Sequence, residues 1–137
     1  VYTVMRTRTG PYKDMVNLLV TAPSIDGPWS DAIYLNSRGF DPSLFHDDDG
    51  RKWLVQIQWD HRKEHPSFAG IVVQEYVPAS RCLRGEVRRI FQKDRLIEGP
   101  NIYKHQGRYY LMVAEGGTSW DHAVAMARSA DLFGPYE

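Results

Sequence analysis

The stretch DPSLFHDDDGRKWLV, residues 41–55, recurs later in the chain, and this recurrence decides the fold. The later copy, GPNIYKHQGRYYLM at residues 99–112, repeats a proline, two apolar residues, a polar turn with Gly-Arg and a second apolar run, 57 or 58 positions further on. A third, partial copy is visible because VYTVM at residues 1–5 resembles RYYLM at residues 108–112, at an offset of 107. The chain therefore contains a repeated unit of about 55 residues.

The repeated unit is made of β-structure. Short apolar runs follow one another along the chain, separated by Gly, Pro, Asp and Ser, and no stretch shows sustained helical periodicity with caps. Four short strands per unit at a fixed period are typical of a propeller blade. The one whole blade runs from about Gly39 to Phe91, with strands expected near residues 42–46, 52–59, 70–76 and 86–91.

The repeat predicts the layout of the chain. We expect an all-β fragment of a β-propeller in which one complete four-stranded blade is flanked by parts of two neighbours. In this layout residues 1–35 end one blade, residues 36–94 form the complete blade, and residues 95–137 begin the next. Because the sequence starts inside a strand-like run and stops directly after a turn, we expect a piece of a longer protein, which associates with the remainder of its parent chain or with itself.

Composition excludes several classes of function. Lys plus Arg and Asp plus Glu each number 17, so a formal net charge of zero gives no electrostatic argument for binding nucleic acid or an anionic membrane. No apolar run approaches the roughly 18–20 residues of a membrane span. The single cysteine, Cys82, excludes an internal disulfide framework and has no metal-type spacing around it. No basic-then-apolar signal sequence is present, which favours a cytoplasmic over a secreted location.

Two acids occupy corresponding places in successive blades. Asp41 and Glu98, 57 residues apart, both lie where the innermost strand of a blade begins. Innermost strands line the central channel of a propeller, so both carboxylates are expected at one end of that channel. Paired carboxylates are typical of glycosidic bond cleavage, although an Asp before a proline also caps turns and most glutamates are surface residues.

The motifs around these acids resemble a known family. GFDPSLFHDDDGRKWLVQIQWDHR and EGPNIYKHQGRYYLMVAEGGTSWDHAVAMARS, followed by GPYE, are similar to glycoside hydrolase family 43, and within it to the β-xylosidase and α-L-arabinofuranosidase branch. The resemblance covers essentially the whole chain. It implies a five-bladed β-propeller that hydrolyses β-xylosides or α-arabinofuranosides with inversion, acting on xylo-oligosaccharide or arabinoside substrates of plant cell walls, without a cofactor.

The resemblance also implies roles for the acids. Glu98, in the EGP motif, corresponds to the general acid, and Asp41, in the DPS motif, to the residue that orients the acid and tunes its pKa. Burial and the nearby charge of Asp41 are expected to raise the pKa of Glu98. The family's general base lies in an earlier blade and has no counterpart in this chain. Inversion requires a base to activate water, so the isolated chain is expected to be inactive.

Other residues near the motifs have two interpretations each. Phe40, Trp59 and Thr118 correspond to sugar-subsite residues by the resemblance, whereas packing within the blade explains the two aromatic residues equally well. Glu115 is expected to form a structural ion pair, with Arg128 as a candidate partner. His61, Arg62 and His122 are expected to form hydrogen bonds in loops, because two distant histidines are weak evidence for a metal. Asp47, Asp48 and Asp49 lack the calcium-loop spacing and are expected at a solvated hairpin tip.

Two further functions remain open. A propeller without catalysis would bind carbohydrate or act as a scaffold, and a protein-interaction propeller would carry shorter and more regular blades without aligned acids. An Asp on the innermost strand of the preceding blade would favour the enzyme.

Overall fold

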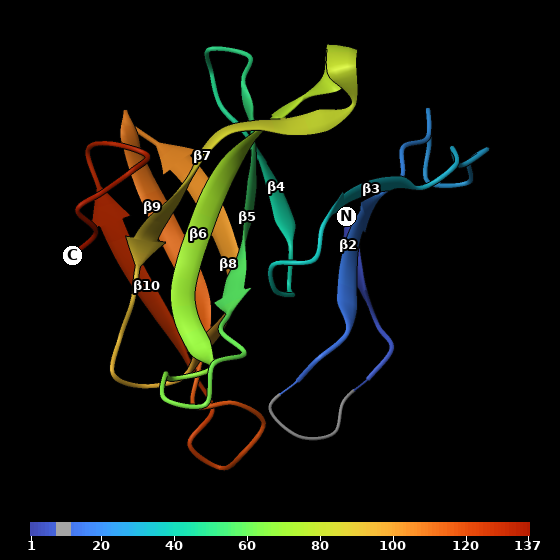
Figure 1. Ribbon diagram of the computed structural model, residues 1–137. Coiled ribbons are helices and arrows are strands. Elements are labelled where there is room, and N and C mark those ends of the chain that lie inside the picture. Colours follow the sequence, from blue (N-terminus) through green and yellow to red (C-terminus); the bar gives the residue numbers. More distant parts are fainter. Residues whose placement is uncertain (8–11) are drawn as a thin grey trace.

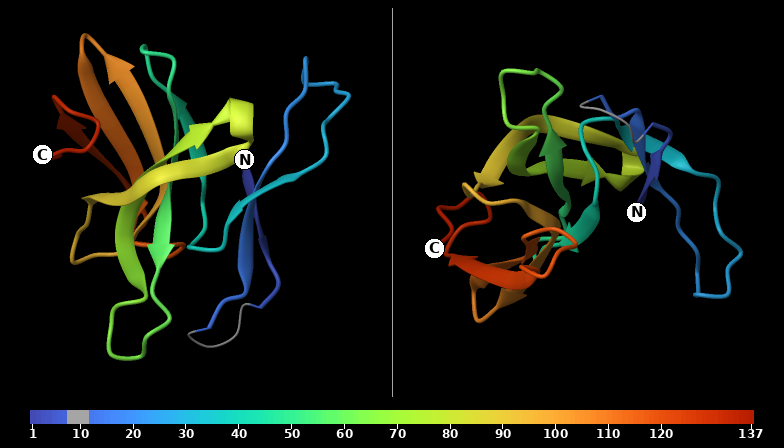
Figure 2. Two further views of the ribbon diagram at one scale, coloured as in Figure 1. Left: turned by 45° about the horizontal axis from the view of Figure 1, so that its top comes forward. Right: turned by 90° about the horizontal axis from the view of Figure 1, so that it is seen from below.

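The chain forms three antiparallel β-sheets that fan out side by side (Figures 1 and 2). The computed structural model describes residues 1–7 and 12–137. The strands, in chain order, are β1 Tyr2–Met5, β2 Met15–Leu19, β3 Ile33–Asn36, β4 Ser43–His46, β5 Lys52–Trp59, β6 Phe68–Val77, β7 Cys82–Phe91, β8 Ile97–His105, β9 Arg108–Glu115 and β10 Ala123–Ser129. Within the described part, the one helical element is the 3-10 turn Pro78–Ser80. The all-β prediction is therefore confirmed.

Each sheet is a simple meander. The strand orders are β1-β2-β3, β4-β5-β6-β7 and β8-β9-β10, and every neighbouring pair is antiparallel. The central sheet is the complete blade predicted from the repeat. Its last two strands are longer than predicted, because the 3-10 turn and Arg81, whose φ is +52°, reverse the chain tightly and let both strands extend toward it.

The complete blade is buried on both faces. Trp53, Val55 and Ile57 of β5 pack toward the third sheet, and Leu54 packs toward the first. Alternate side chains of a strand point to opposite faces, so a strand covered on both sides reads as a continuous apolar run. This explains why KWLVQIQW shows only partial alternation.

The two outer sheets each lack one strand of a blade. By the offset of 107, β1 and β2 correspond to β9 and β10, so the first sheet lacks an innermost strand. Glu137 exchanges two backbone hydrogen bonds of 2.8 and 2.9 Å with Arg128 on the outer edge of β10. Ser30 donates the equivalent bond to Thr21, 2.8 Å long, just before β3. The edge of β10 therefore repeats the backbone pairing that precedes β3 in the first sheet.

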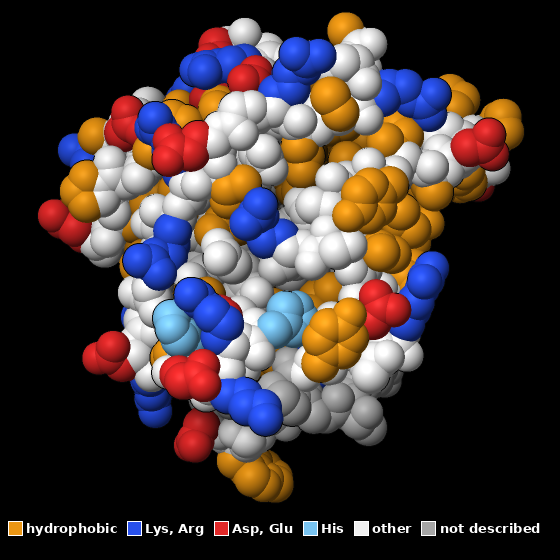
Figure 3. Space-filling view, in the orientation of Figure 1, with side chains coloured by type: hydrophobic (Ala, Val, Ile, Leu, Met, Phe, Trp, Pro, Cys, Tyr) orange, Lys and Arg blue, Asp and Glu red, His pale blue; other side chains and the backbone are white. Residues whose placement is uncertain are grey.

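Each of the two outer sheets carries exposed hydrophobic side chains. In Figure 3 hydrophobic side chains gather over the first sheet, whose exposed residues include Tyr2, Val4, Trp29 and Tyr34. On β10, Val124 and Met126 are 69% and 60% exposed, on the face that points away from the central sheet. These are faces that a neighbouring blade covers in a closed propeller.

One expectation for the acidic hairpin is wrong. Asp47 does not lie in a solvated tip but is buried between the central and third sheets. Lys104 contacts its Oδ1 at 2.6 Å, and the hydroxyl of Tyr109 donates a hydrogen bond of 2.8 Å to its Oδ2. The neighbouring sheet covers this side of the turn, which the local sequence does not reveal. Asp48 and Asp49 are exposed, as expected.

No group of three or more potential metal-binding side chains occurs in the described ranges 1–7 and 12–137. The same ranges contain no helix that is long and apolar enough to cross a membrane.

Candidate active site

Asp41 and Glu98 lie together at one end of the two innermost strands. Asp41 comes two residues before β4, and Glu98 is the second residue of β8. The backbone N–H of Gly99 donates a hydrogen bond of 3.1 Å to Oδ2 of Asp41, which joins the two segments directly. The loops that follow β5 and β9 lie at the same end, at the bottom of Figure 1. The structure therefore brings together the two acids that the repeat placed at one channel end.

The local backbone fixes the direction of Asp41. Its φ is +52°, a left-handed conformation that is uncommon for residues other than glycine but several-fold enriched for Asp and Asn. The preceding segment is held on β5, because Ile57 and Trp59 donate backbone hydrogen bonds of 3.1 and 3.0 Å to the carbonyls of Phe40 and Arg38. The turn into β4 thus aims the carboxylate at β8 instead of along its own strand.

The electrostatics of Glu98 agree with the sequence expectation. Burial raises the pKa of Glu98, the negative charge of Asp41 raises it further, and His122 lowers it. Glu98 is half-buried, so its carboxyl group loses part of its hydration and favours the protonated form. The site therefore holds an acid whose proton affinity is increased by a second acid from the adjacent sheet.

Asp41 has an environment of its own. Burial of its carboxyl group outweighs the lowering effect of the hydrogen bond from the Gly99 N–H, so the pKa of Asp41 is raised overall. The N–H bond favours the charged form, and a charged Asp41 is the species that increases the proton affinity of Glu98.

Aromatic rings cluster beside Asp41. Phe40, Trp59 and Phe68 pack against one another in edge-to-face or tilted arrangements, with ring centroids 5.0 to 6.1 Å apart. The ammonium group of Lys13 lies 4.9 Å from the centroid of the Trp59 ring. Trp59 is only 8% exposed, so a packing role is evident in the structure. Sugar contacts by Phe40 and Trp59 stay a prediction.

Thr118 lies in the exposed loop between β9 and β10. The backbone N–H of Gly116 donates a hydrogen bond of 3.1 Å to the carbonyl of Leu96, which anchors the loop beside the start of β8. The ring of His122 contacts the carbonyl of Gly117, which confirms the expected loop hydrogen bond. The fully exposed Trp120 lies two residues after Thr118, and sequence reasoning missed both its exposure and the effect of His122 on Glu98.

Glu115 forms the expected structural ion pair, but with other partners. Its carboxylate contacts Lys93 at 2.6 Å and Arg95 at 3.1 Å, both from the loop between β7 and β8. The prediction of Arg128 as the partner was wrong: Arg128 lies on β10, where it pairs with Tyr110 of β9. In the loop after β5, Arg62 bonds Asp60 as expected, and His61 packs its ring against Tyr12 with centroids 5.1 Å apart.

Comparisons with known proteins identify the family of this chain. The family described as glycosyl hydrolases family 43 matches residues 1–137. The chain is 54% identical over 139 residues to "Xylosidase/arabinosidase 43B" of Humicola insolens and 50% identical over 139 residues to "Beta-xylosidase" of Bacillus subtilis. Each match covers all of this chain and 26% of the relative.

A solved structure matches the fold closely. The crystal structure of xylan beta-1,4-xylosidase from Bacillus halodurans C-125 has a TM-score of 0.96 and 58% sequence identity to this chain. The match covers 99% of this chain and 26% of that protein. The chain thus spans about a quarter of the length of the relatives it matches.

Proposed function

This chain belongs to glycosyl hydrolase family 43, and from that premise we propose that it supplies the acid half of the active site of a β-xylosidase or α-L-arabinofuranosidase. The chain is homologous to xylosidases and arabinosidases and matches part of the five-bladed propeller of this family. The observation that carries the proposal is the Gly99–Asp41 hydrogen bond, because it holds a second carboxylate beside Glu98.

In this proposal Glu98 is the general acid. It enters the reaction protonated and donates its proton to the glycosidic oxygen as the bond to the anomeric carbon breaks. The raised pKa of Glu98 favours the protonated form that this role requires. Asp41 orients Glu98 and increases its proton affinity. A water molecule adds to the anomeric carbon from the opposite face, and a base outside this chain accepts its proton.

The substrate is proposed to lie across the same end of the channel. Phe40, which is half-buried, lies next to Asp41 with the buried Trp59 ring packed against it, and the exposed Thr118 lies in the loop next to β8. Aromatic faces pack against the apolar faces of sugar rings, and a hydroxyl bonds a sugar hydroxyl. The substrate class is xylo-oligosaccharides or arabinosides of plant cell walls.

The test compares the isolated 137-residue chain with a full-length protein that contains it. Both are assayed on aryl β-xylosides and aryl α-L-arabinofuranosides, and the first sugar anomer released is identified by proton NMR. We expect turnover by the full-length protein alone, with α-xylose released first from β-xylosides. Turnover by the isolated chain at the rate of the full-length protein would refute the proposal that the general base lies outside this chain. A full-length protein that binds xylo-oligosaccharides without turnover would favour the non-catalytic propeller.

A further inference from the structure

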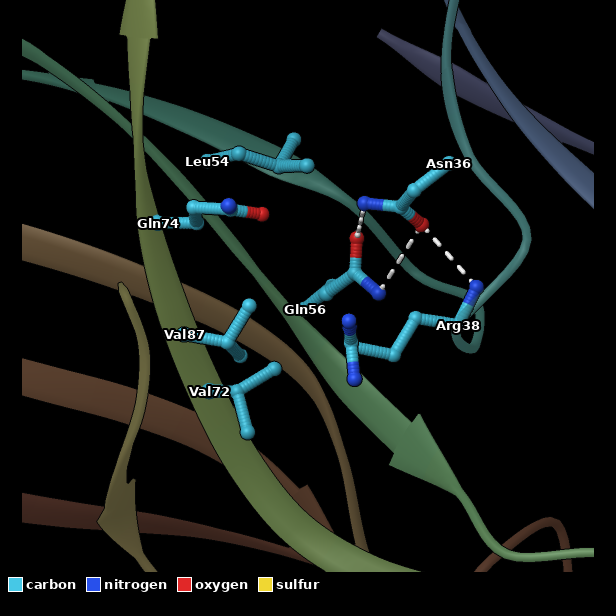
Figure 4. A pocket seen from close by; sticks show the side chains of 7 residues that line it. All are labelled: Asn36, Arg38, Leu54, Gln56, Val72, Gln74 and Val87. Atoms are coloured by element: carbon cyan, nitrogen blue, oxygen red, sulfur yellow. Dashed lines mark hydrogen bonds between the residues drawn. The ribbon is translucent and has the colours of Figure 1, made fainter. Parts of the chain in front are cut away.

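A cluster of buried amide side chains joins the first sheet to the central sheet. Asn17 of β2 and Gln56 of β5 are 0% and 1% exposed, and the half-buried Asn36 of β3 forms hydrogen bonds with both. Asn17 Nδ2 donates to Asn36 Oδ1 at 3.0 Å, and Asn36 Nδ2 donates to Gln56 Oε1 at 3.0 Å. Figure 4 shows Asn36 and Gln56 facing each other in a crevice that does not admit a water-sized molecule.

These amides are placed where apolar packing is the rule. The surrounding contact between the two sheets is made by leucines and a tyrosine: Leu19, Leu35, Leu54 and Tyr76. A buried amide without partners costs roughly 1–3 kcal/mol, so a packing role alone would be served better by apolar residues. The side chain of Asn17 is held from both ends, because Thr3 on β1 donates a hydrogen bond of 2.6 Å to its Oδ1.

Asn17 also makes one contact that leads to the candidate active site. Its Nδ2 donates a buried hydrogen bond of 2.9 Å to the carbonyl of Gly39, two residues before Asp41. The backbone at Gly39 packs so closely against β5 that no side chain fits there, since a Cβ would lie 1.8 Å from the carbonyl oxygen of Ile57. The segment 38–41 is therefore fixed by β5 on one side and by Asn17, from the preceding sheet, on the other.

We propose that Asn17 is a positioning residue for Asp41, and that the buried amide cluster couples the first sheet to the acid pair in the central and third sheets. The proposal rests on the proposed function of Asp41 and Glu98. The Asn17 bond to Gly39 fixes the turn that gives Asp41 its left-handed backbone, and this backbone aims the carboxylate at Gly99. Loss of the amide lets the turn relax and moves the Asp41 charge away from Glu98.

Replacing Asn17 should change kcat and the pH–rate profile, and not only the stability of the protein. A misplacement of about 1 Å at a reacting group costs up to roughly 100-fold in rate, so Asn17→Ala should lower kcat by roughly 10- to 100-fold while KM changes little. The charged groups that act on Glu98 are Asp41, from the segment before β4, and His122, from the loop after β9. Because Asn17→Ala weakens only the Asp41 contribution, the basic limb of the pH–rate profile should move to lower pH.

The test uses a full-length active protein that contains this chain. Asn17→Ala, which removes the whole set of Asn17 amide bonds, is compared with Tyr109→Phe, which removes one side-chain hydrogen bond between sheets at the opposite end of the innermost strands. Both variants should lose thermal stability, Asn17→Ala more than Tyr109→Phe because Asn17 is fully buried and makes more hydrogen bonds, but only Asn17→Ala should lower kcat and shift the basic limb. In an Asp41→Asn background, Asn17→Ala should change kcat by less than about twofold, because residues that act as one unit are not additive.

Each outcome decides the proposal. If Asn17→Ala matches Tyr109→Phe in kcat and pH profile while Asp41→Asn impairs both, the positioning role of Asn17 is refuted and the proposed function stands. If Asp41→Asn itself leaves kcat and the pH profile unchanged, the proposed function of Asp41 fails first. If Asn17→Ala lowers kcat as much in the Asp41→Asn background as in the unaltered protein, the positioning role is also refuted. Should Asn17→Ala not fold, Asn17→Ser, which keeps a hydroxyl in the cluster, decides by the same criteria.

Discussion

The backbone N–H of Gly99 donates a hydrogen bond to the carboxylate of Asp41, 58 residues earlier in the chain and one sheet away. Glu98 is the chain neighbour of Gly99, so the same bond that orients Asp41 also helps to fix the position of Glu98 near the start of β8. A single contact between two sheets thus sets the relative positions of both acids. The chemistry proposed for the site depends on this contact remaining intact.

Replacing Glu98 by Gln in a full-length active protein should separate substrates by their leaving groups. Natural xylosides need a proton on the departing oxygen, whereas acidic phenols leave without one. We expect kcat/KM to fall by roughly 10²- to 10⁴-fold on xylobiose and far less on a dinitrophenyl xyloside. Glu115→Gln is the matched control, because Glu115 pairs with Lys93 and Arg95. Equal losses on both substrates for Glu98→Gln would contradict its role as proton donor.

Replacing Asp41 by Asn should narrow the pH range of activity on its basic side. The general acid works only while it is protonated, so activity falls as the pH rises through the pKa of Glu98. Burial and the charge of Asp41 raise that pKa, and removing the charge lowers it. The basic limb of the kcat/KM profile should therefore move to lower pH. An unmoved or higher basic limb would show that Asp41 does not tune Glu98.

Replacing His122 should move the same limb in the opposite direction. His122 lowers the pKa of Glu98, so His122→Asn should raise that pKa and extend activity to higher pH. Asparagine retains an N–H that can bond the Gly117 carbonyl, which keeps the loop after β9 in place. The measurement is the kcat/KM profile on one aryl xyloside for both the His122 and the Asp41 variants. Shifts of the same sign in the two variants would be incompatible with this electrostatic assignment.

Asp47 should make stability depend on pH in the acid range. Burial raises the pKa of Asp47, but the bonds from Lys104 and Tyr109 outweigh burial, and the pKa is lowered overall. The stabilisation is therefore present above the unfolded-state value and is lost as the pH falls below about 4. Asp47→Asn should cost about 1–2 kcal/mol at pH 7, after allowance for solvent screening, and less at pH 3 than at pH 7. Urea unfolding at both pH values checks this, and a constant difference would argue against it.

The isolated chain should associate with itself. The open edge of β10 and the exposed side chains of Val124 and Met126 are surfaces that favour strand pairing and apolar contact. We expect light scattering at tens of micromolar to report oligomers or aggregates. Val124→Lys combined with Met126→Glu should shift the distribution toward monomer. A clean monomer of the unaltered chain would show that these surfaces are closed in another way.

The repeat in the sequence carried most of the fold and the centre of the site. Equivalent apolar residues such as Leu54 and Leu111 are both buried, because successive blades pack in the same way. The proximity of Asp41 and Glu98 was predictable, because the repeat places each of them near the start of an innermost strand. Their roles came from the resemblance of the DPS and EGP motifs, not from the spacing.

Contacts between blades were not predictable from the sequence. Asp47 reads locally as part of a solvated hairpin, yet its partners Lys104 and Tyr109 lie 57 and 62 residues away. The same reason hides the partners of Glu115 and the Asn17 cluster. A side chain that bonds across two sheets has a local sequence like that of a surface residue, because periodicity reports which face is covered and not what covers it.

The ion pair between Asp47 and Lys104 has a consequence for how such a repeat can be designed. By the offset of 58 that carries Phe45 onto Tyr103, Lys104 corresponds to His46 and not to Asp47, so the ion pair joins non-equivalent positions of adjacent blades. A repeat that carried lysine at the first of these positions and aspartate at the second would bring opposite charges together at each such contact between blades. A consensus propeller with identical repeats can therefore keep this ion pair, because both partners fit into one repeated hairpin.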